Sequence, residues 1–178
     1  NTTLSGYFAA AAVGGLMSAK TNTAEPLTNK TVSGFTIERS RAYRPAVVNQ
    51  LLSAGVCLLE PVSGGGRIVH GLTTAQSGAP EDEEISIVEV RQQVTRILRA
   101  SLRQYVGKIN SPTLIQEISG AVDKVMRSLV SVGLLTGYSD IVVARNPAET
   151  RQIDIGVKAS PAGPLNWISA DIEFSMGG

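Results

Sequence analysis

Few residues of this 178-residue chain have the type and spacing that catalysis or metal binding requires. His70 is the only histidine and Cys57 the only cysteine, so these two side chains cannot by themselves build a zinc site, and no disulfide can form within the chain. Cys57 lies in an apolar run and His70 in a run of strand-forming residues. We therefore expect Cys57 to be a small buried apolar side chain and His70 to occupy a strand or interface position.

Three short motifs resemble ligand-binding elements, and each has a simpler interpretation. Residues 14–21 approach a phosphate-binding loop, but Ala19 stands where that loop needs glycine, and an alanine-rich segment precedes it instead of a strand. Residues 63–67 are compatible with an anion cradle, although their glycines favour a hairpin turn. The acidic run 81–84 is compatible with cation binding, although a solvated loop before a helix is more typical. We predict no catalytic, cofactor or metal site.

Basic residues gather on two predicted helices. Arg96, Arg99 and Arg103 share the side of one helix opposite its apolar face, and Lys124 and Arg127 lie on the next helix. Two interpretations of the arginine face remain open, namely a solvated surface or a docking surface for an acidic partner. The net charge of +1 and the lack of interleaved aromatic residues argue against a nucleic-acid partner.

The composition predicts a folded chain whose surface faces other protein. Hydrophobic residues make up 43%, which excludes a disordered chain, and charged residues only 17%, below the usual quarter. The most apolar stretch, residues 4–19, is interrupted by glycine and serine and is too short to span a bilayer, so we expect no direct membrane insertion. The chain starts at Asn1, which fits a fragment or a processed product.

The elements that must position these residues are predicted as groups of helices followed by groups of strands. Apolar periodicity and capping residues predict helices at residues 4–20, 41–54, 85–106 and 111–133. Alternation and turn residues predict strands at residues 56–62, 67–74, 141–144, 152–159 and 165–175, the first two forming a hairpin. Residues 21–34 read as an extended crossing segment and residues 75–84 as a loop. The sum is an α+β fold, a two-layer domain with two main helices on an antiparallel or mixed sheet and extended terminal arms.

Each predicted helix has an expected packing face. These faces are Tyr7, Phe8, Ala11 and Leu16 in the first helix; Val47, Val48, Leu51 and Leu52 in the second; Ile87, Val90, Val94, Ile97, Leu98, Ser101 and Tyr105 in the third; and Leu114, Ile115, Ile118, Val122, Val125, Met126 and Leu129 in the fourth.

The second half of the chain resembles the C-terminal domain of phage tail sheath proteins. The resemblance is carried by the order of short motifs: a strand running into 71-GLTT-74, 85-ISIVEVR-91 opening a helix, 105-YVGKIN-110 closing it, a proline-initiated helix ending in 133-GLLTG-137, and two terminal strands around a proline-containing turn. The first half is also similar to the family in its alanine- and glycine-rich helix, in 28-TNKTVSG-34 and in 51-LLSAGV-56. Family members are normally longer, with an upstream arm that this sequence does not include. We assign residues 1–66 to a helix, a crossing segment and the start of the core sheet, and residues 67–178 to the conserved C-terminal domain, within one structural domain.

The resemblance implies a structural subunit and not an enzyme. Sheath subunits stack as rings around a tail tube, contract, and so drive the tube through a host envelope. Their terminal arms add strands to the sheets of neighbouring subunits. On this sequence the arm would be the alternating terminal strand, with Leu165, Trp167, Ile168, Ala170, Ile172 and Phe174 as its apolar residues. An ordinary hairpin within the chain, between that strand and residues 152–159, is the open alternative.

The resemblance also implies partners and a location. The partners are neighbouring sheath subunits, the tail tube protein, and the baseplate and tail terminator proteins. No cofactor is implied, and the protein would belong to a virion tail assembled in the bacterial cytoplasm. A helix of the domain holds the tube, and we expect it to be the one with Arg96, Arg99 and Arg103, with Lys124 and Arg127 of the next helix as the competing surface. Two alternatives stay open: the sheath of a tailocin or injection system, and a small α+β ligand-binding protein or enzyme.

Overall fold

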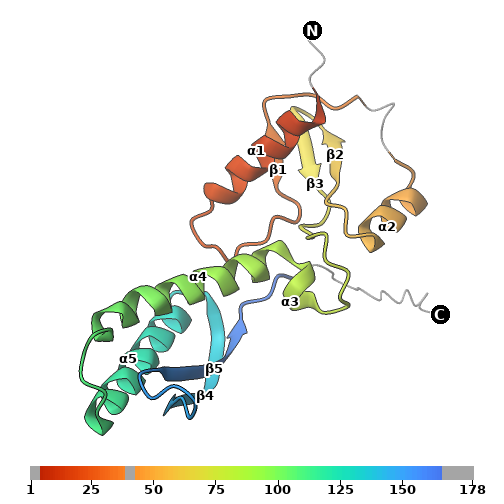
Figure 1. The fold of residues 1–178 in the computed structure, drawn as a ribbon. Helices are drawn as coiled ribbons and strands as arrows, with labels where there is room; N and C mark the ends of the chain where they lie inside the picture. Colours follow the sequence, from red (N-terminus) through yellow and green to blue (C-terminus); the bar gives the residue numbers. More distant parts are fainter. Residues whose placement is uncertain (1–4, 39–42, 166–178) are drawn as a thin grey trace, which may run out of the picture.

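The computed structural model describes residues 5–38 and 43–165 (Figure 1). Its elements are α1 (Gly6–Ser18), β1 (Thr31–Ser33), α2 (Pro45–Ser53), β2 (Leu59–Val62), β3 (Gly65–Ile68), α3 (Pro80–Glu83), α4 (Ile85–Leu102), the 3₁₀ turn η2 (Arg103–Tyr105), α5 (Pro112–Ser131), β4 (Leu135–Arg145) and β5 (Ile153–Pro161). The α+β class is confirmed, but the described strands form two separate antiparallel sheets and not one.

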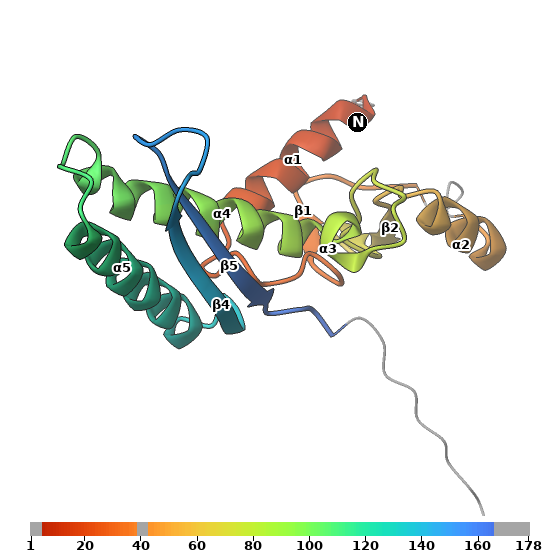
Figure 2. The same cartoon turned by 60° about the horizontal axis from the view of Figure 1, so that its bottom comes forward.

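The larger core lies between two helices and a hairpin, with α4 and α5 packed against β4 and β5 (Figures 1 and 2). The side chain of Ser111 caps α5 by accepting a bond from the Leu114 amide at 3.2 Å, with Pro112 at the first helical position. Gly133, with φ of 73°, follows the end of the helix. The predicted apolar faces of both helices are confirmed, and the buried residues of this core are Ala24, Val90, Val94, Leu114, Ile118, Val122, Met126, Leu129, Leu134 and Leu135.

The β4–β5 hairpin is longer than the sequence pattern predicts. β4 was expected to cover residues 141–144 but runs over eleven, Leu135–Arg145, because nearly its whole length is hydrogen-bonded to β5. The residues before Ile141 do not alternate between apolar and polar, and the register shifts between Ser139 and Val142. Asp140, at that irregularity, has a φ of 55°.

The N-terminal half is built on a small three-stranded antiparallel sheet in the order β1-β3-β2. Its core is Leu27, Val32 and Ile68, which are almost fully buried. The predicted hairpin around residues 63–66 is confirmed, with Gly64 at φ of 81° in its turn. The strand expected at residues 56–62 starts only at Leu59 and is not fully buried, and β3 ends at Ile68 and not at residue 74. The segment 21–34 contains β1, which the sequence pattern did not predict, because only pairing with β3 orders those three residues.

The packing faces predicted for α1 and α2 are only partly correct. Ala12, Val13, Leu16 and Met17 pack α1 against the small sheet. Tyr7 and Phe8, in contrast, are 66% and 48% exposed and lie against each other, with ring centroids 4.4 Å apart. No residue of α2 is fully buried. Both helices therefore lie on the outside of the described structure.

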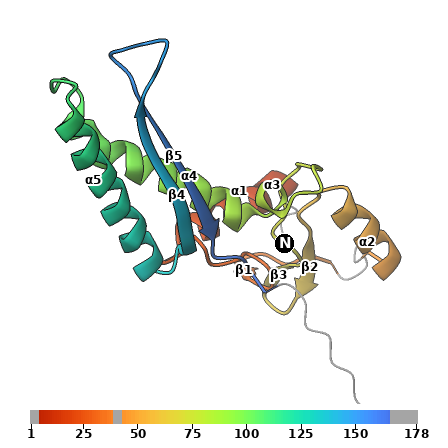
Figure 3. The same cartoon turned by 90° about the horizontal axis from the view of Figure 1, so that it is seen from below.

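The segments before α4 that belong to the N-terminal half lie beside this helix (Figure 3), and polar contacts join the two halves along its first turns. Lys20, after α1, has a side chain that is 4% exposed, and its Nζ bonds Glu89 together with the Thr23 and Glu25 carbonyls at 3.2 and 3.1 Å. Thr23 bonds Gln93 one turn further along α4. On the other side, the amide of Ile85 donates to the Gly71 carbonyl at 2.9 Å. The N-terminal half is thus attached to α4 through two different segments.

Candidate functional site: open strand edges and a basic helix face

The β4–β5 hairpin has two open edges. Within the described residues each strand pairs only with the other, so the outer edge of each carries backbone groups without a strand partner. Both strands are long, with eleven and nine residues, and Val142 and Ile155 are 58% and 37% exposed. Long strands with free edges and exposed apolar side chains are ready templates for further strands.

The segment predicted to be a strand arm leaves directly from this hairpin. β5 ends at Pro161, and the Ala162 amide donates to the Leu134 carbonyl at 3.1 Å. Leu165 is 76% exposed. The other arm residues, Trp167, Ile168, Ala170, Ile172 and Phe174, lie outside the described residues. The start of the arm is therefore at the molecular surface, and its pairing stays a prediction.

The basic residues of α4 and α5 differ in their surroundings. Arg96, Arg99 and Arg103 are exposed, and none forms an ion pair with another described residue. On α5, Arg127 bonds Asp123, so its charge is partly compensated. Lys124 is exposed and lines an open groove of about 840 Å³ between the two helices. Among these described residues, the arginine face thus carries three positive charges without an ion pair, whereas on α5 only Lys124 has none.

Asp123 receives two hydrogen bonds that the sequence pattern did not reveal. Arg127 bonds one carboxylate oxygen, and Tyr138 of β4 donates its hydroxyl to the other at 2.7 Å. The bonds from Arg127 and then Tyr138 lower the pKa of Asp123, and the bond to Asp123 raises the pKa of Tyr138. Nothing in the spacing of these residues signals the contact, because it depends on how β4 crosses α5.

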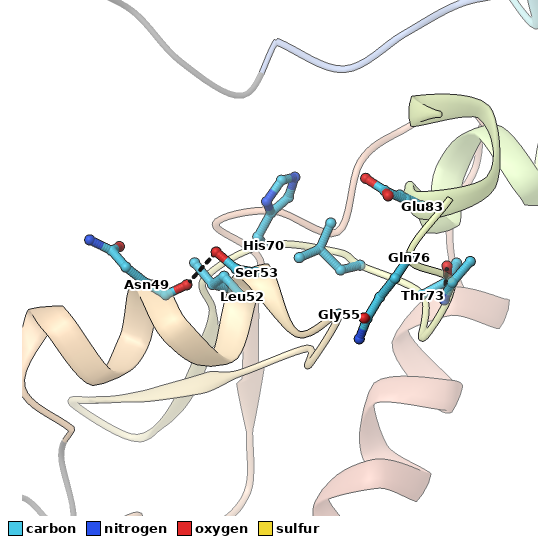
Figure 4. Close-up of a pocket in the computed structure, with 10 residues that line it drawn as sticks. Asn49, Leu52, Ser53, Gly55, His70, Thr73, Gln76 and Glu83 are labelled. Carbon is cyan, nitrogen blue, oxygen red and sulfur yellow. Dashed lines mark hydrogen bonds between the residues drawn. The ribbon is translucent and has the colours of Figure 1, made fainter. Parts of the chain in front are cut away.

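A second cavity, of about 370 Å³, lies between α2 and the segment that leads into α3 (Figure 4). Its polar lining residues include Asn49, Ser53, His70, Thr73 and Glu83. His70 is not in a strand but just after β3, with its Nε2 2.9 Å from Glu84 Oε2.

The acidic run differs from the predicted solvated loop. Its first three residues form the short helix α3, and Glu84 is only 4% exposed, because the strand-like segment 71–73 covers the junction of α3 and α4. Within residues 5–38 and 43–165, no three or more histidine, cysteine or acidic side chains are grouped to hold a metal ion.

The remaining motifs have structural roles. The phosphate-loop-like residues 14–21 belong to α1 and its end, where Lys20 is held by protein oxygens. Cys57 is half-buried against the small core, less than predicted, and burial raises the pKa of its thiol. In the described part of the chain, no helix combines the length and the apolar character needed to cross a membrane.

Comparisons with known proteins give one consistent result. No family model matches the chain. A tail sheath protein of Bacillus phage SP01 is 27% identical over 174 residues, which are 96% of this chain and 30% of that protein. The fold matches a chain of the anti-feeding prophage baseplate (TM-score 0.78, 16% identity, 92% of this chain and 48% of that one). It also matches the contracted helical sheath of the same particle (TM-score 0.72, 16% identity, 90% and 48%).

A crystal structure agrees with these matches. The sheath tail protein of Desulfitobacterium hafniense superposes with a TM-score of 0.72 at 16% identity, over 90% of this chain and 39% of that one. The chain therefore spans about a third of the length of its curated relative and half or less of the solved chains. The resemblance seen in the sequence motifs is confirmed: the chain is similar in sequence to a phage tail sheath protein and shares the fold of contractile-sheath proteins.

Proposed function

We propose that this chain is the polymerising core of a contractile tail sheath subunit, whose copies surround an inner tube and contract to drive it through a host envelope. The observation that carries the proposal is the β4–β5 hairpin, which has two open edges and is followed by a segment with a strand pattern in its sequence, whose first residue, Leu165, is exposed. Similarity to a tail sheath protein supports the same role. The protein would act by assembly and not by catalysis.

Strand exchange would link the copies. The terminal segment of one copy would add to an open hairpin edge of its neighbour through backbone hydrogen bonds, and alternate side chains would fill pockets there. In the sequence, Ile168, Ala170, Ile172 and Phe174 alternate with more polar residues, as such an arm requires. A two-stranded hairpin is marginal on its own, so added strands would also stabilise it.

The tube would be held by α4. Arg96, Arg99 and Arg103 present uncompensated charge on one exposed face, which suits acidic groups on a tube. Lys124 and Arg127 of α5 form the competing surface, and the bond from Arg127 to Asp123 makes that surface the less favoured one.

Contraction would rearrange the copies as rigid bodies that stay connected by their arms. The energy would come from a metastable extended assembly, so no nucleotide is required. The baseplate and the tail terminator would bound the polymer at its two ends, in a virion tail assembled in the bacterial cytoplasm. The contracted helical sheath of the anti-feeding prophage has the same fold. The alternative is therefore the sheath of an injection system or tailocin, which would assemble and contract in the same way.

The test is negative-stain electron microscopy of the protein as its gene encodes it, at high concentration. We expect hollow striated cylinders from the unchanged protein and none after truncation before Leu165. A triple substitution of Ile168, Ile172 and Phe174 by serine should act like the truncation. Substitution of Asp171 and Glu173 by serine, on the opposite side of the predicted strand, is the matched control and should leave the cylinders intact.

Two outcomes would contradict the proposal. Cylinders from the truncated protein would show that the terminal segment does not link the copies. The proposed sheath role would also be wrong if the protein formed only uniform single particles under every condition, including after tube protein is added to start assembly.

A further inference from the structure

The loop between α4 and α5 carries the most exposed large apolar side chains of the described structure. Val106 and Ile109 are 83% and 88% exposed. We call residues 106–109 the tip. Exposure of this kind is common for single residues, but two highly exposed aliphatic side chains within four residues of one loop offer a contact surface.

Hydrogen bonds fix the tip against the rest of the domain. The Lys108 amide donates to the Tyr105 carbonyl at 3.2 Å, across Gly107 at φ of 89°. Asn110 Nδ2 donates to the Thr150 carbonyl at 2.9 Å, and Arg145 donates to the Asn110 carbonyl at 3.0 Å. The tip is thus tied to the end of the β4–β5 hairpin, and a fixed apolar projection loses little freedom when it binds.

The tip is also positively charged. Lys108 is exposed, with its Nζ 4.8 Å from the centroid of the Tyr105 ring. No acidic residue occurs in the sequence 103–110. A partner for this surface must therefore combine an apolar recess with negative charge.

The same chain carries a recess of that kind beside α3. The 370 Å³ cavity described above, here called the socket, has a mixed lining: its apolar side chains are Leu52, Leu72 and Ala75, and its polar ones are Asn49, Ser53, His70, Thr73, Gln76 and Glu83. Figure 4 shows Glu83 on the opposite side of the cavity from Asn49 of α2. Glu81 is exposed on α3, the same short helix that carries Glu83.

The tip and the socket lie at opposite ends of α4 (Figure 1). The helix has 18 residues, which corresponds to about 27 Å. The two surfaces therefore cannot meet within one molecule, but they can meet between two copies. A contact between different surfaces of identical copies repeats from copy to copy and builds a ring or an open helix.

We propose that the tip of one copy inserts into the socket of the next, with Val106 and Ile109 in the recess and Lys108 facing Glu81 and Glu83. The inference rests on the proposed role as a polymerising subunit, and it adds a contact that does not involve strand exchange. A second copy is the occupant because this chain itself supplies both the apolar projection and the recess of opposite charge.

The test is sedimentation velocity of the protein as its gene encodes it, over a range of concentrations. Serine at both Val106 and Ile109 should weaken self-association by about a hundred-fold, because the aliphatic side chains that fill the recess are lost. Val132→Ser, at a position 57% exposed beyond the opposite end of α5, is the matched control and should change nothing. Circular dichroism of each variant establishes that it is folded.

Reversing the charge on each side of the proposed contact tests whether Lys108 of the tip faces Glu81 beside the socket. Lys108→Glu and Glu81→Lys should each weaken association by about ten-fold, and a mixture of the two variants should recover it, because each tip then meets a socket of opposite charge. The inference would be overturned if the variant with serine at Val106 and Ile109 associated as strongly as the unchanged protein. It would also be overturned if mixing the Lys108→Glu and Glu81→Lys variants did not restore association. Loss of tube binding with normal self-association would show that the tip binds the tube instead.

Truncation before Leu165 distinguishes the two proposals. If strand exchange does not link the copies, truncation leaves assembly unchanged, while serine at Val106 and Ile109 still weakens it. If the tip contact is wrong, the serine variant assembles normally while truncation abolishes assembly.

Discussion

Tyr138 on β4 donates its hydroxyl to Asp123 on α5 at 2.7 Å, and Arg127 bonds the second oxygen of the same carboxylate. The Tyr138 bond joins the hairpin to the helix, and the Arg127 bond lies within the helix and holds the same carboxylate. Because both bonds favour the ionised carboxylate, the pKa of Asp123 is lower in the folded protein than its usual value. The hairpin that we propose as the strand acceptor therefore depends on an ionised group.

Asp123→Asn should lower the Tm at neutral pH, and the difference from the wild-type protein should shrink in acid. A lowered folded pKa gives stability that is present above the unfolded value, near 4, and is lost as the pH falls through the folded value. Thermal unfolding followed by circular dichroism between pH 7 and about pH 2.5 measures the difference. Glu117→Gln, on the exposed side of the same helix, is the control. A constant difference at every pH would contradict the role of the charge.

Lys20→Met should destabilise the protein by about 3 kcal/mol, because Glu89 would keep its charge in a mostly buried position without a partner. Adding Glu89→Gln should restore part of that loss. Lys30→Met is the matched control, since Lys30 and Glu25 are both about 40% exposed, and it should have little effect. Urea denaturation gives the free energies of unfolding, and equal losses in the two lysine variants would refute a special role for Lys20.

Two glycine substitutions should act in opposite directions. A Cβ on Gly65 would lie 2.0 Å from the Val32 carbonyl oxygen, so Gly65→Ala should separate β1 from β3 and cost about 1–3 kcal/mol. A Cβ on Gly14, within α1, would meet no atom within 4 Å, so Gly14→Ala should stabilise the protein by about 0.5–1 kcal/mol. Urea denaturation measures both changes. A Gly65→Ala protein as stable as the wild type would contradict the close approach of β1 and β3, and a destabilised Gly14→Ala protein would contradict the open surroundings of Gly14.

Glutamate at both Arg99 and Arg103 should weaken attachment to tube protein and leave sheath polymers intact. The reason is that repulsion replaces attraction on the exposed face of α4. Co-sedimentation with tube protein at several salt concentrations measures the effect. Glutamate at both Lys124 and Arg127 is the competing variant. If it releases the tube while the α4 variant does not, the tube contact belongs to α5.

The sequence predicts most reliably those elements whose own residues contain the signal. α4 and α5 bury one face each over several turns, so their apolar spacing repeats, and Ser111 and Pro112 mark a start that the structure reproduces. β4 is different: Gly137 and Asp140 break its alternation, and its full length is visible only through its pairing with β5. Tyr7 and Phe8 have the spacing of a packing face, yet no other element covers them in the described structure.

The proposed assembly surfaces also differ in whether their own residues contain the signal that predicts them. The arginine face of α4 follows from helical spacing, and the structure adds that no described acidic side chain neutralises it. The open edges of the hairpin cannot be derived from the sequence, because a strand pattern does not tell which neighbours a strand has. The partly buried pair of His70 and Glu84 was missed for a related reason: fourteen residues and a change of direction separate the two side chains.

The division of the interior into two cores also determines the order in which the chain can fold. All buried residues of the larger core except Ala24 come from residues 90–135, so they lie close together in the sequence and can meet early. Lys20 and Thr23, however, need Glu89 and Gln93 of α4 as their docking partners. On the ribosome the alanine-rich α1 is therefore made before the α4 residues that secure it. During that interval its apolar side is open to other chains, so we expect newly made protein to need protection by chaperones until α4 has emerged.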